Sequence, residues 1–129
     1  MLVLADDNLG TITRFDSRGR HHASGPSPTV AVGAAAGTGA TATIVGDDTA
    51  GTITVTTGTT PAAGALAVVT FAAAWAAAPP FVILTPKTAA AAGLGVYASS
   101  TTTTLTIGAA NLPTASTVYS FDYQVVGGT

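Results

Sequence analysis

Charged and histidine side chains are distributed very unevenly along this chain of 129 residues. Eight of the twelve lie within the first 22 residues, and only Asp47, Asp48, Lys87 and Asp122 follow them. A body with so few ionisable groups has little with which to shift a pKa or to activate a nucleophile. The sequence therefore predicts a short polar arm followed by a nearly uncharged body, and it predicts that the protein is not an enzyme.

The composition of the body favours β-structure. The chain contains 24 threonines and no glutamate, and threonine suits the half-buried surface of a sheet better than a helix. Hydrophobic residues make up 47% of the chain and charged residues 8%, which excludes the disordered class because that class combines low hydrophobicity with high net charge. About 100 residues are enough for one hydrophobic core. We expect a single all-β domain after the arm.

Seven short segments of the body have the patterns of strands and are separated by Gly, Pro, Asn or Asp. The expected strands are residues 40–45, 51–57, 66–71, 81–85, 95–99, 103–107 and 118–126. Within the second of them Ile53 and Val55 alternate with threonines, and in the last segment alternate residues form an aromatic face that we expect to be core. That face consists of Tyr119, Phe121, Tyr123 and Val125. This spacing predicts an antiparallel, jelly-roll-like β-sandwich of about seven strands, preceded by an extended N-terminal arm.

The domain boundary is expected near residue 28. Residues 25–28 read Gly-Pro-Ser-Pro, a linker in which the prolines enforce extended backbone, so residues 1–28 form the arm and linker and residues 29–129 the sandwich. The alternating segment 11–16 predicts one strand in the arm, with 2–4 as its only candidate partner. An unpaired strand offers its backbone to another sheet, so attachment by strand addition is expected. Residues 33–39, rich in Gly and Ala, predict a loop or a loosely held edge.

The arm carries the candidate partner-binding residues. These are Ile12, Arg14, Phe15, Arg18, Arg20, His21 and His22. Guanidinium groups bind carboxylates and phosphates through paired hydrogen bonds, although the same arginines could serve only to keep the arm soluble. The two adjacent histidines could bind a metal, but neighbours in an extended segment point in opposite directions and the near sequence does not complete a ligand set. We expect a protein contact, and no metal.

Few residues of the body are candidates for chemistry. Asp47-Asp48 resembles a fragment of a calcium loop but lacks its alternating ligands, so a turn between strands is expected. Both histidines lie in the arm, which excludes a catalytic triad in the body. The absence of cysteine excludes disulfides and thiolate metal sites. Trp75 and Tyr97 could form a platform for stacking a sugar, with core packing as the alternative. No cofactor is expected.

Neither a membrane nor nucleic acid is an expected partner. Residues 62–78 are apolar apart from Gly64 and Thr70, but alanine drives membrane insertion weakly and Pro79-Pro80 follows at once, so two strands and a turn are favoured over a membrane helix. Residues 1–5 are too short an apolar run for a signal peptide. The formal net charge of −2 gives no basis for binding to nucleic acid.

Several segments together resemble the small β-domains of tailed-phage virion proteins. They are Ala50-Gly-Thr-Ile-Thr-Val-Thr-Thr-Gly-Thr-Thr-Pro-Ala-Ala-Gly, Val69-Thr-Phe, Trp75-Ala-Ala-Ala-Pro, Val82-Ile-Leu-Thr-Pro, Gly95-Val-Tyr-Ala-Ser-Ser and Tyr119-Ser-Phe-Asp-Tyr. Such domains end tail fibres and minor tail proteins or decorate heads, and Arg14-Phe-Asp-Ser-Arg-Gly-Arg resembles the short hairpin before them. The resemblance covers residues 11–126 and transfers no catalytic residues.

The resemblance implies a structural building block of the virion surface, assembled as a homotrimer. A decoration protein needs a docking arm and a compact domain, which matches this chain. Its arm would contact the major capsid protein. One alternative is the tip of a tail fibre or minor tail protein, attached to the tail or baseplate and binding a host receptor, although the chain has no shaft. A carbohydrate-binding module centred on Trp75 and Tyr97 is a second alternative.

Overall fold

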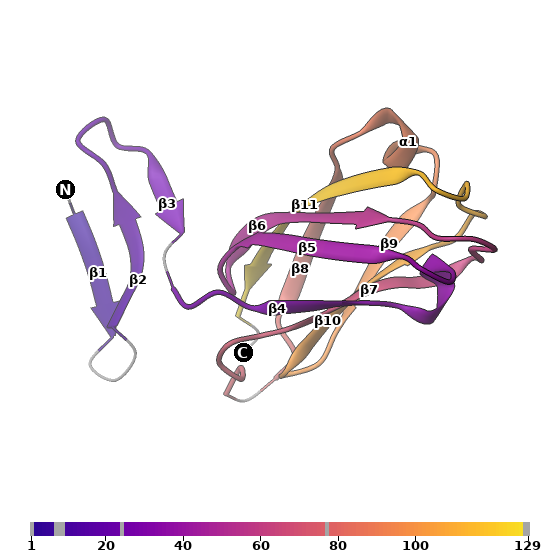
Figure 1. The fold of residues 1–129 in the computed structure, drawn as a ribbon. Helices are drawn as coiled ribbons and strands as arrows, with labels where there is room; N and C mark the ends of the chain where they lie inside the picture. The colour runs from indigo at the N-terminus through magenta and orange to yellow at the C-terminus, as the bar shows by residue number, and fades with distance from the viewer. Residues whose placement is uncertain (1, 7–9, 24, 77, 128–129) are drawn as a thin grey trace.

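The computed structural model describes residues 2–6, 10–23, 25–76 and 78–127. From residue 29 onward the chain forms two four-stranded antiparallel sheets packed face to face (Figure 1). One sheet holds, in spatial order, β4 (Thr29–Val32), β7 (Gly64–Thr70), β10 (Thr104–Ala109) and β9 (Val96–Ser100). The other holds β5 (Thr41–Gly46), β6 (Ala50–Thr56), β11 (Val118–Val126) and β8 (Phe81–Pro86). The expected antiparallel β-sandwich is confirmed, with two four-stranded sheets.

The core lies between the two sheets and follows the alternation of the strands. Ile53 and Val55 on β6 have no exposed surface, as the alternation predicts. The aromatic face of β11 is also buried, with Tyr119 2% exposed, Phe121 0% and Tyr123 4%. The opposite sheet contributes side chains of β7 and β10 that are equally buried. They are Leu66, Ala67, Val69, Leu105 and Ile107.

An eighth strand of the sandwich was not expected from the sequence. Residues Thr29–Val32 form β4 at the edge of the first sheet, where they pair with β7. Only Val30 of this strand is packed against the core. So short a segment, with small residues and a weak alternation of burial, gives little signal of a strand on its own.

Residues 33–39 connect β4 to β5 outside any named strand, as the loop alternative predicts, but they are not loosely held. Ala34–Ala36 form a short 3-10 helix, η1, in which Ala36 is fully buried. The backbone here is tied to the sandwich, since the amide of Gly58 donates to the carbonyl of Ala36 at 2.9 Å and that of Ala62 donates to the carbonyl of Ala35 at the same distance. Small residues let this backbone approach its neighbours closely, so the expectation of a loosely held edge is wrong for a physical reason.

The two alanine-rich segments behave differently. Residues Ala89–Ala92 form one helical turn, α1, in which the hydroxyl of Thr88 accepts a hydrogen bond from the amide of Ala91 at 3.2 Å. The described part of residues 72–78 is irregular. Among the described residues no helix is long and apolar enough to cross a membrane.

The arm forms a small antiparallel sheet of its own. Its strands are β1 (Leu2–Asp6), β2 (Gly10–Phe15) and β3 (His21–Ala23), with β2 in the centre. Residues 2–4, the candidate partner named from the sequence, do pair with β2, and β3 occupies its other edge. The hypothesis that β2 is an unpaired strand is therefore wrong. A partner strand could pair only with the outer edge of β1 or of β3.

Candidate functional site: the β2–β3 turn

The turn between β2 and β3 gathers most of the described charges of the arm around Asp16. One oxygen of its carboxylate accepts hydrogen bonds from the backbone amides of Arg18 and Arg20, each at 2.9 Å. The other oxygen faces Nε of Arg20 at 2.5 Å and Nε2 of His22 at 3.4 Å. Gly19, with a φ of +77°, supplies the left-handed conformation that the turn requires. An aspartate at the start of a turn commonly binds its own backbone in this way.

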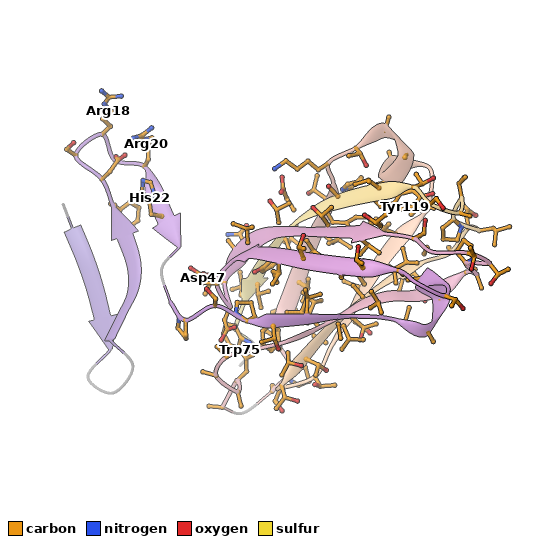
Figure 2. All side chains as sticks on the ribbon, viewed as in Figure 1. Arg18, Arg20, His22, Asp47, Trp75 and Tyr119 are labelled. Atoms are coloured by element: carbon orange, nitrogen blue, oxygen red, sulfur yellow. The ribbon has the colours of Figure 1, made fainter. Side chains whose placement is uncertain are left out.

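These contacts engage the side chain of Arg20 but not that of Arg18. The Nε atom of Arg20 is engaged by Asp16, whereas the Arg18 guanidinium, which is exposed, has no partner among the described residues. Arg18, Arg20 and His22 lie together at this turn (Figure 2). A free guanidinium beside a second, partly exposed one can bind a carboxylate or another anion with charge-assisted hydrogen bonds.

Asp16 is expected to titrate with a pKa of about 2, below its ordinary 3.8. The amide of Arg20 is the largest cause, slight burial opposes it, and the side chain of Arg20, the amide of Arg18 and His22 add to the lowering. Because the pKa is depressed in the folded arm, the carboxylate supports the turn fully above about pH 3.8 and loses this role as pH falls through about 2. Carboxyl ¹³C shifts measured by NMR should give this midpoint. A midpoint near 3.8 would show that the turn is not organised around Asp16.

The other predicted arm residues are Ile12, Arg14, Phe15 and His21. The side chains of Ile12, Arg14 and His21 lie outside the described ones, and the structure gives their backbone pairing only. Arg14 is the Cα partner of His22, and Phe15 that of His21. Phe15 is partly buried. The structure therefore brings together Arg18, Arg20 and His22, and adds Asp16, which the sequence-based list lacked although its position before a Ser-Arg-Gly turn was the available signal.

The turn at Asp47 and Asp48 is structural, as expected. One carboxylate oxygen of Asp47 accepts hydrogen bonds from the amide and hydroxyl of Thr49, both at 2.7 Å. The carboxylate of Asp48 accepts the amides of Ala72 and Ala73 at 2.8 and 2.9 Å. Burial, followed by the nearby charges of Asp47 and Asp48, raises the pKa of Tyr123, whose hydroxyl donates to the carbonyl of Asp47 at 2.5 Å. These carboxylates are occupied by the protein's own donors.

The linker passes this turn. A Cβ atom at Gly25 would lie 3.8 Å from the Cβ of Asp47, and Pro28 is buried where β4 begins. The arm sheet therefore joins the sandwich at the end that carries the Asp47 turn (Figure 2). Among the described residues no group of three or more His, Cys, Asp or Glu side chains could hold a metal ion.

Trp75 and Tyr97 do not form one platform. The Trp75 ring packs edge-on against Phe71, with centroids 6.0 Å apart, and its amide donates to Thr102 in the β9–β10 turn. Tyr97 lies three residues before β9 ends at Ser100, roughly 10 Å along the strand from the turn that Trp75 contacts. Its ring lies over Gly108 on the outer face. Tyr97 is 48% exposed, and Trp75 is half-buried. A sugar stacked on both rings is not supported by this arrangement.

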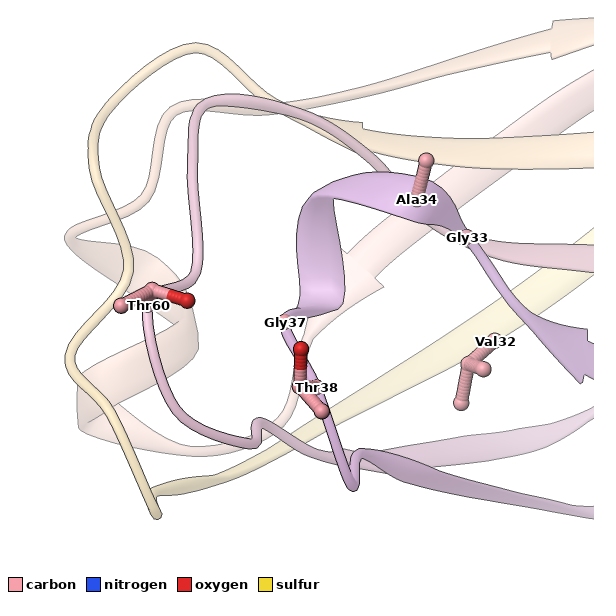
Figure 3. Close-up of a pocket in the computed structure, with 6 residues that line it drawn as sticks. All are labelled: Val32, Gly33, Ala34, Gly37, Thr38 and Thr60. Carbon is pink, nitrogen blue, oxygen red and sulfur yellow. The ribbon is translucent and has the colours of Figure 1, made fainter.

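A shallow hollow of about 470 Å³ lies near η1 (Figure 3). It is lined by Val32, Gly33, Ala34, Gly37, Thr38 and Thr60. Its side chains offer two hydroxyls and no charge, and Thr60 has a φ of +52°. Such a lining lacks an acid, a base or a charged group to orient a reacting ligand.

Comparisons of the chain with family profiles, curated proteins and solved structures find no match. The resemblance to tailed-phage virion proteins therefore remains an expectation from the sequence. The geometry contributes a separate observation. The described cationic groups of the arm gather at the β2–β3 turn, whereas the sandwich presents one Lys87–Asp122 ion pair at 3.3 Å and the internally bonded Asp47 turn.

Proposed function

We propose that this chain is a non-enzymatic structural protein of a tailed-phage virion, a decoration protein that docks on the capsid through its arm and displays the sandwich on the virion surface. The observation that carries the proposal is the division of the chain into a small sheet with a cationic turn and a nearly uncharged sandwich. The two parts are joined by the Gly-Pro-Ser-Pro linker at residues 25–28. This division matches one part that attaches and another that is displayed.

The arm has physical reasons to dock. A sheet of three short strands needs a packed hydrophobic face to be stable, and docking on a partner would supply that burial. The unpaired guanidinium of Arg18 favours an acidic patch on that partner. Since β2 is paired on both sides, any added strand from the capsid protein would extend the sheet at β1 or β3.

Deleting residues 1–24 is expected to abolish association with particles and leave the sandwich folded, because all eight of its strands begin at or after Thr29. Purified full-length and truncated proteins would be added to particles that lack the protein, and bound protein measured after sedimentation. Circular dichroism and a cooperative melt serve as the folding control. Undiminished binding by a folded truncated protein would show that the sandwich docks directly.

Location on the particle is a separate measurement. Immuno-electron microscopy with an antibody against the sandwich should label the head. Label confined to the tail would replace the decoration role with that of a tail-fibre or minor tail protein tip. We also propose that the protein assembles as a homotrimer, since faces made of threonine and alanine let copies approach closely.

A further inference from the structure

One outer face of the sandwich holds most of the exposed large apolar side chains. Eight such side chains are exposed among the described residues, and five of them lie on the outer face of the sheet β5–β6–β11–β8. They are Val45 (75% exposed), Phe81 (68%), Ile83 (57%), Val118 (51%) and Val126 (50%). Phe81 and Val126 are direct cross-strand partners, and Ile83 is two residues along the same face of β8. Exposed apolar side chains gathered on one face indicate an interaction surface.

The polar groups at the centre of this face are already hydrogen-bonded to one another. The hydroxyl of Thr52 donates to Asp122 at 2.6 Å, and Lys87 approaches the same carboxylate oxygen at 3.3 Å. Thr54 and Ser120 share a hydrogen bond of 3.1 Å. The bond from Thr52, followed by the influence of Lys87, lowers the pKa of Asp122 despite slight desolvation. These groups would stay hydrogen-bonded if a protein covered the face, which removes part of the penalty for burying a polar surface.

The outer face of the other sheet differs. It exposes only Tyr97 among the eight described apolar side chains, and that ring lies over Gly108. Of the remaining two, Val32 lies at the hollow near η1, and Leu112 lies in the loop before β11. The two faces of the sandwich are thus unequal, although both are rich in threonine.

We propose that a second copy of this chain docks on the outer face of the sheet β5–β6–β11–β8. The charges of the face argue for this occupant: Lys87 and Asp122 are its two charged side chains, they have opposite signs, and each can meet the other across two copies. A strongly charged partner would meet no patch of opposite charge on this face. The inference rests on the self-assembly proposed above, and not on a location in the virion.

The area of this face is also large enough for a protein interface. Four strands about 4.8 Å apart, each of six to nine residues with a rise of about 3.3 Å, present roughly 400–550 Å² in projection. The accessible area of a corrugated face exceeds its projection and approaches the ~800 Å² per partner of a standard protein interface. The apolar residues lie toward its margins and the bonded hydroxyls at its centre, so contact would cover both.

Two matched substitutions test which face is used. Thr54, between Thr43 and Ser120, is central on the proposed face, and Thr106, between Val68 and Ser99, is central on the other. Both are half-buried. We expect wild-type protein to have two or three times the single-chain mass of 12.5 kDa in sedimentation at micromolar concentration. Thr54→Arg should weaken assembly at least 100-fold, because the interface would bury an unpaired charge, and Thr106→Arg should leave it unchanged.

Cross-linking provides an independent measurement, because the chain has no cysteine. Under mild oxidation, Thr54→Cys should form disulfide-linked copies at least ten times faster than Thr106→Cys. A wild-type mass of 12.5 kDa at 100-fold higher concentration, equal cross-linking rates, or loss of assembly only in Thr106→Arg would overturn the proposal. If Thr54→Arg does not fold, the cross-linking rates of the two cysteine variants test the proposal on their own. Particle binding is measured separately, so a failure here is distinguishable from a failure of the decoration role.

Discussion

Phe121→Ala is expected to lower the free energy of unfolding by about 3–5 kcal/mol. Phe121 is a fully buried residue on β11 and has the largest side chain of that group. On the core face of its sheet it lies between Ile53 on β6 and Pro86 on β8. Removing the ring loses its burial and leaves a cavity that neighbours held in two hydrogen-bonded strands cannot fill.

Urea denaturation followed by fluorescence or circular dichroism would measure the loss. Val126→Ala is the matched control, since it lies on the same strand but on the outer face, where it is 50% exposed. The control should change stability by no more than about 0.5 kcal/mol under conditions in which single chains predominate. A loss below about 1 kcal/mol for Phe121→Ala would show that β11 is not packed as described.

Gly58→Ala is expected to lower the free energy of unfolding by about 3 kcal/mol, near the upper end for overpacking. A Cβ atom at Gly58 would overlap the carbonyl group of Thr38. The position cannot simply move, because its amide donates to Ala36 at 2.9 Å and its carbonyl accepts the amide of Ser116 at 3.2 Å. The clash is with backbone, which relaxes less readily than a flexible side chain.

Gly93→Ala is the control for this substitution. Gly93 has a φ of −74°, and the nearest atom to its added Cβ would be 3.6 Å away. Alanine fits this backbone and restricts the unfolded chain, so the change should be neutral or stabilising by up to about 1 kcal/mol. Thermal melts of both variants would make the comparison. Equal melting temperatures would mean that residues 36–40 do not pack against Gly58.

The strands with clear alternation could be predicted from the sequence. The bounds of β11, residues 118–126, agree with the expectation, and the other six predicted strands differ by one or two residues at their ends. In β5, β6, β8, β9 and β11 the pattern of buried and exposed side chains repeats every two residues, and this local property is readable without knowledge of the partner strand. β4 was not predicted because its alternation of buried and exposed residues is short and weak.

The segment at residues 33–39 shows where composition misleads. Glycine and alanine indicate backbone freedom in an isolated chain, but Gly33 is buried because the backbone of Ala65 lies against it. Ala36 is a core residue with no exposed surface. The close approach of two segments distant in sequence decides whether small residues are loose or tightly packed, and no local pattern reports it.

The candidate site was predictable in part. The cationic character of the arm follows from composition, but the sequence does not show which arginine is free. Asp16 holds Arg20 and leaves Arg18 available, a result of the conformation of the turn. The sequence did not distinguish Trp75 from Tyr97. The structure packs Trp75 against Phe71 and places Tyr97 on the outer face of β9.

Periodicity and composition were sufficient for the all-β class and the core face of β11, because each depends on residues near one another in sequence. The pairing of β2 on both edges, the packing of residues 33–39 and the gathering of Val45, Phe81 and Val118 on one outer face depend on which distant segments become neighbours. Strand order sets those neighbours, and threonine-rich strands with weakly distinct faces encode it poorly. Strand order is therefore set only in the tertiary structure, where the two sheets pack over a common core.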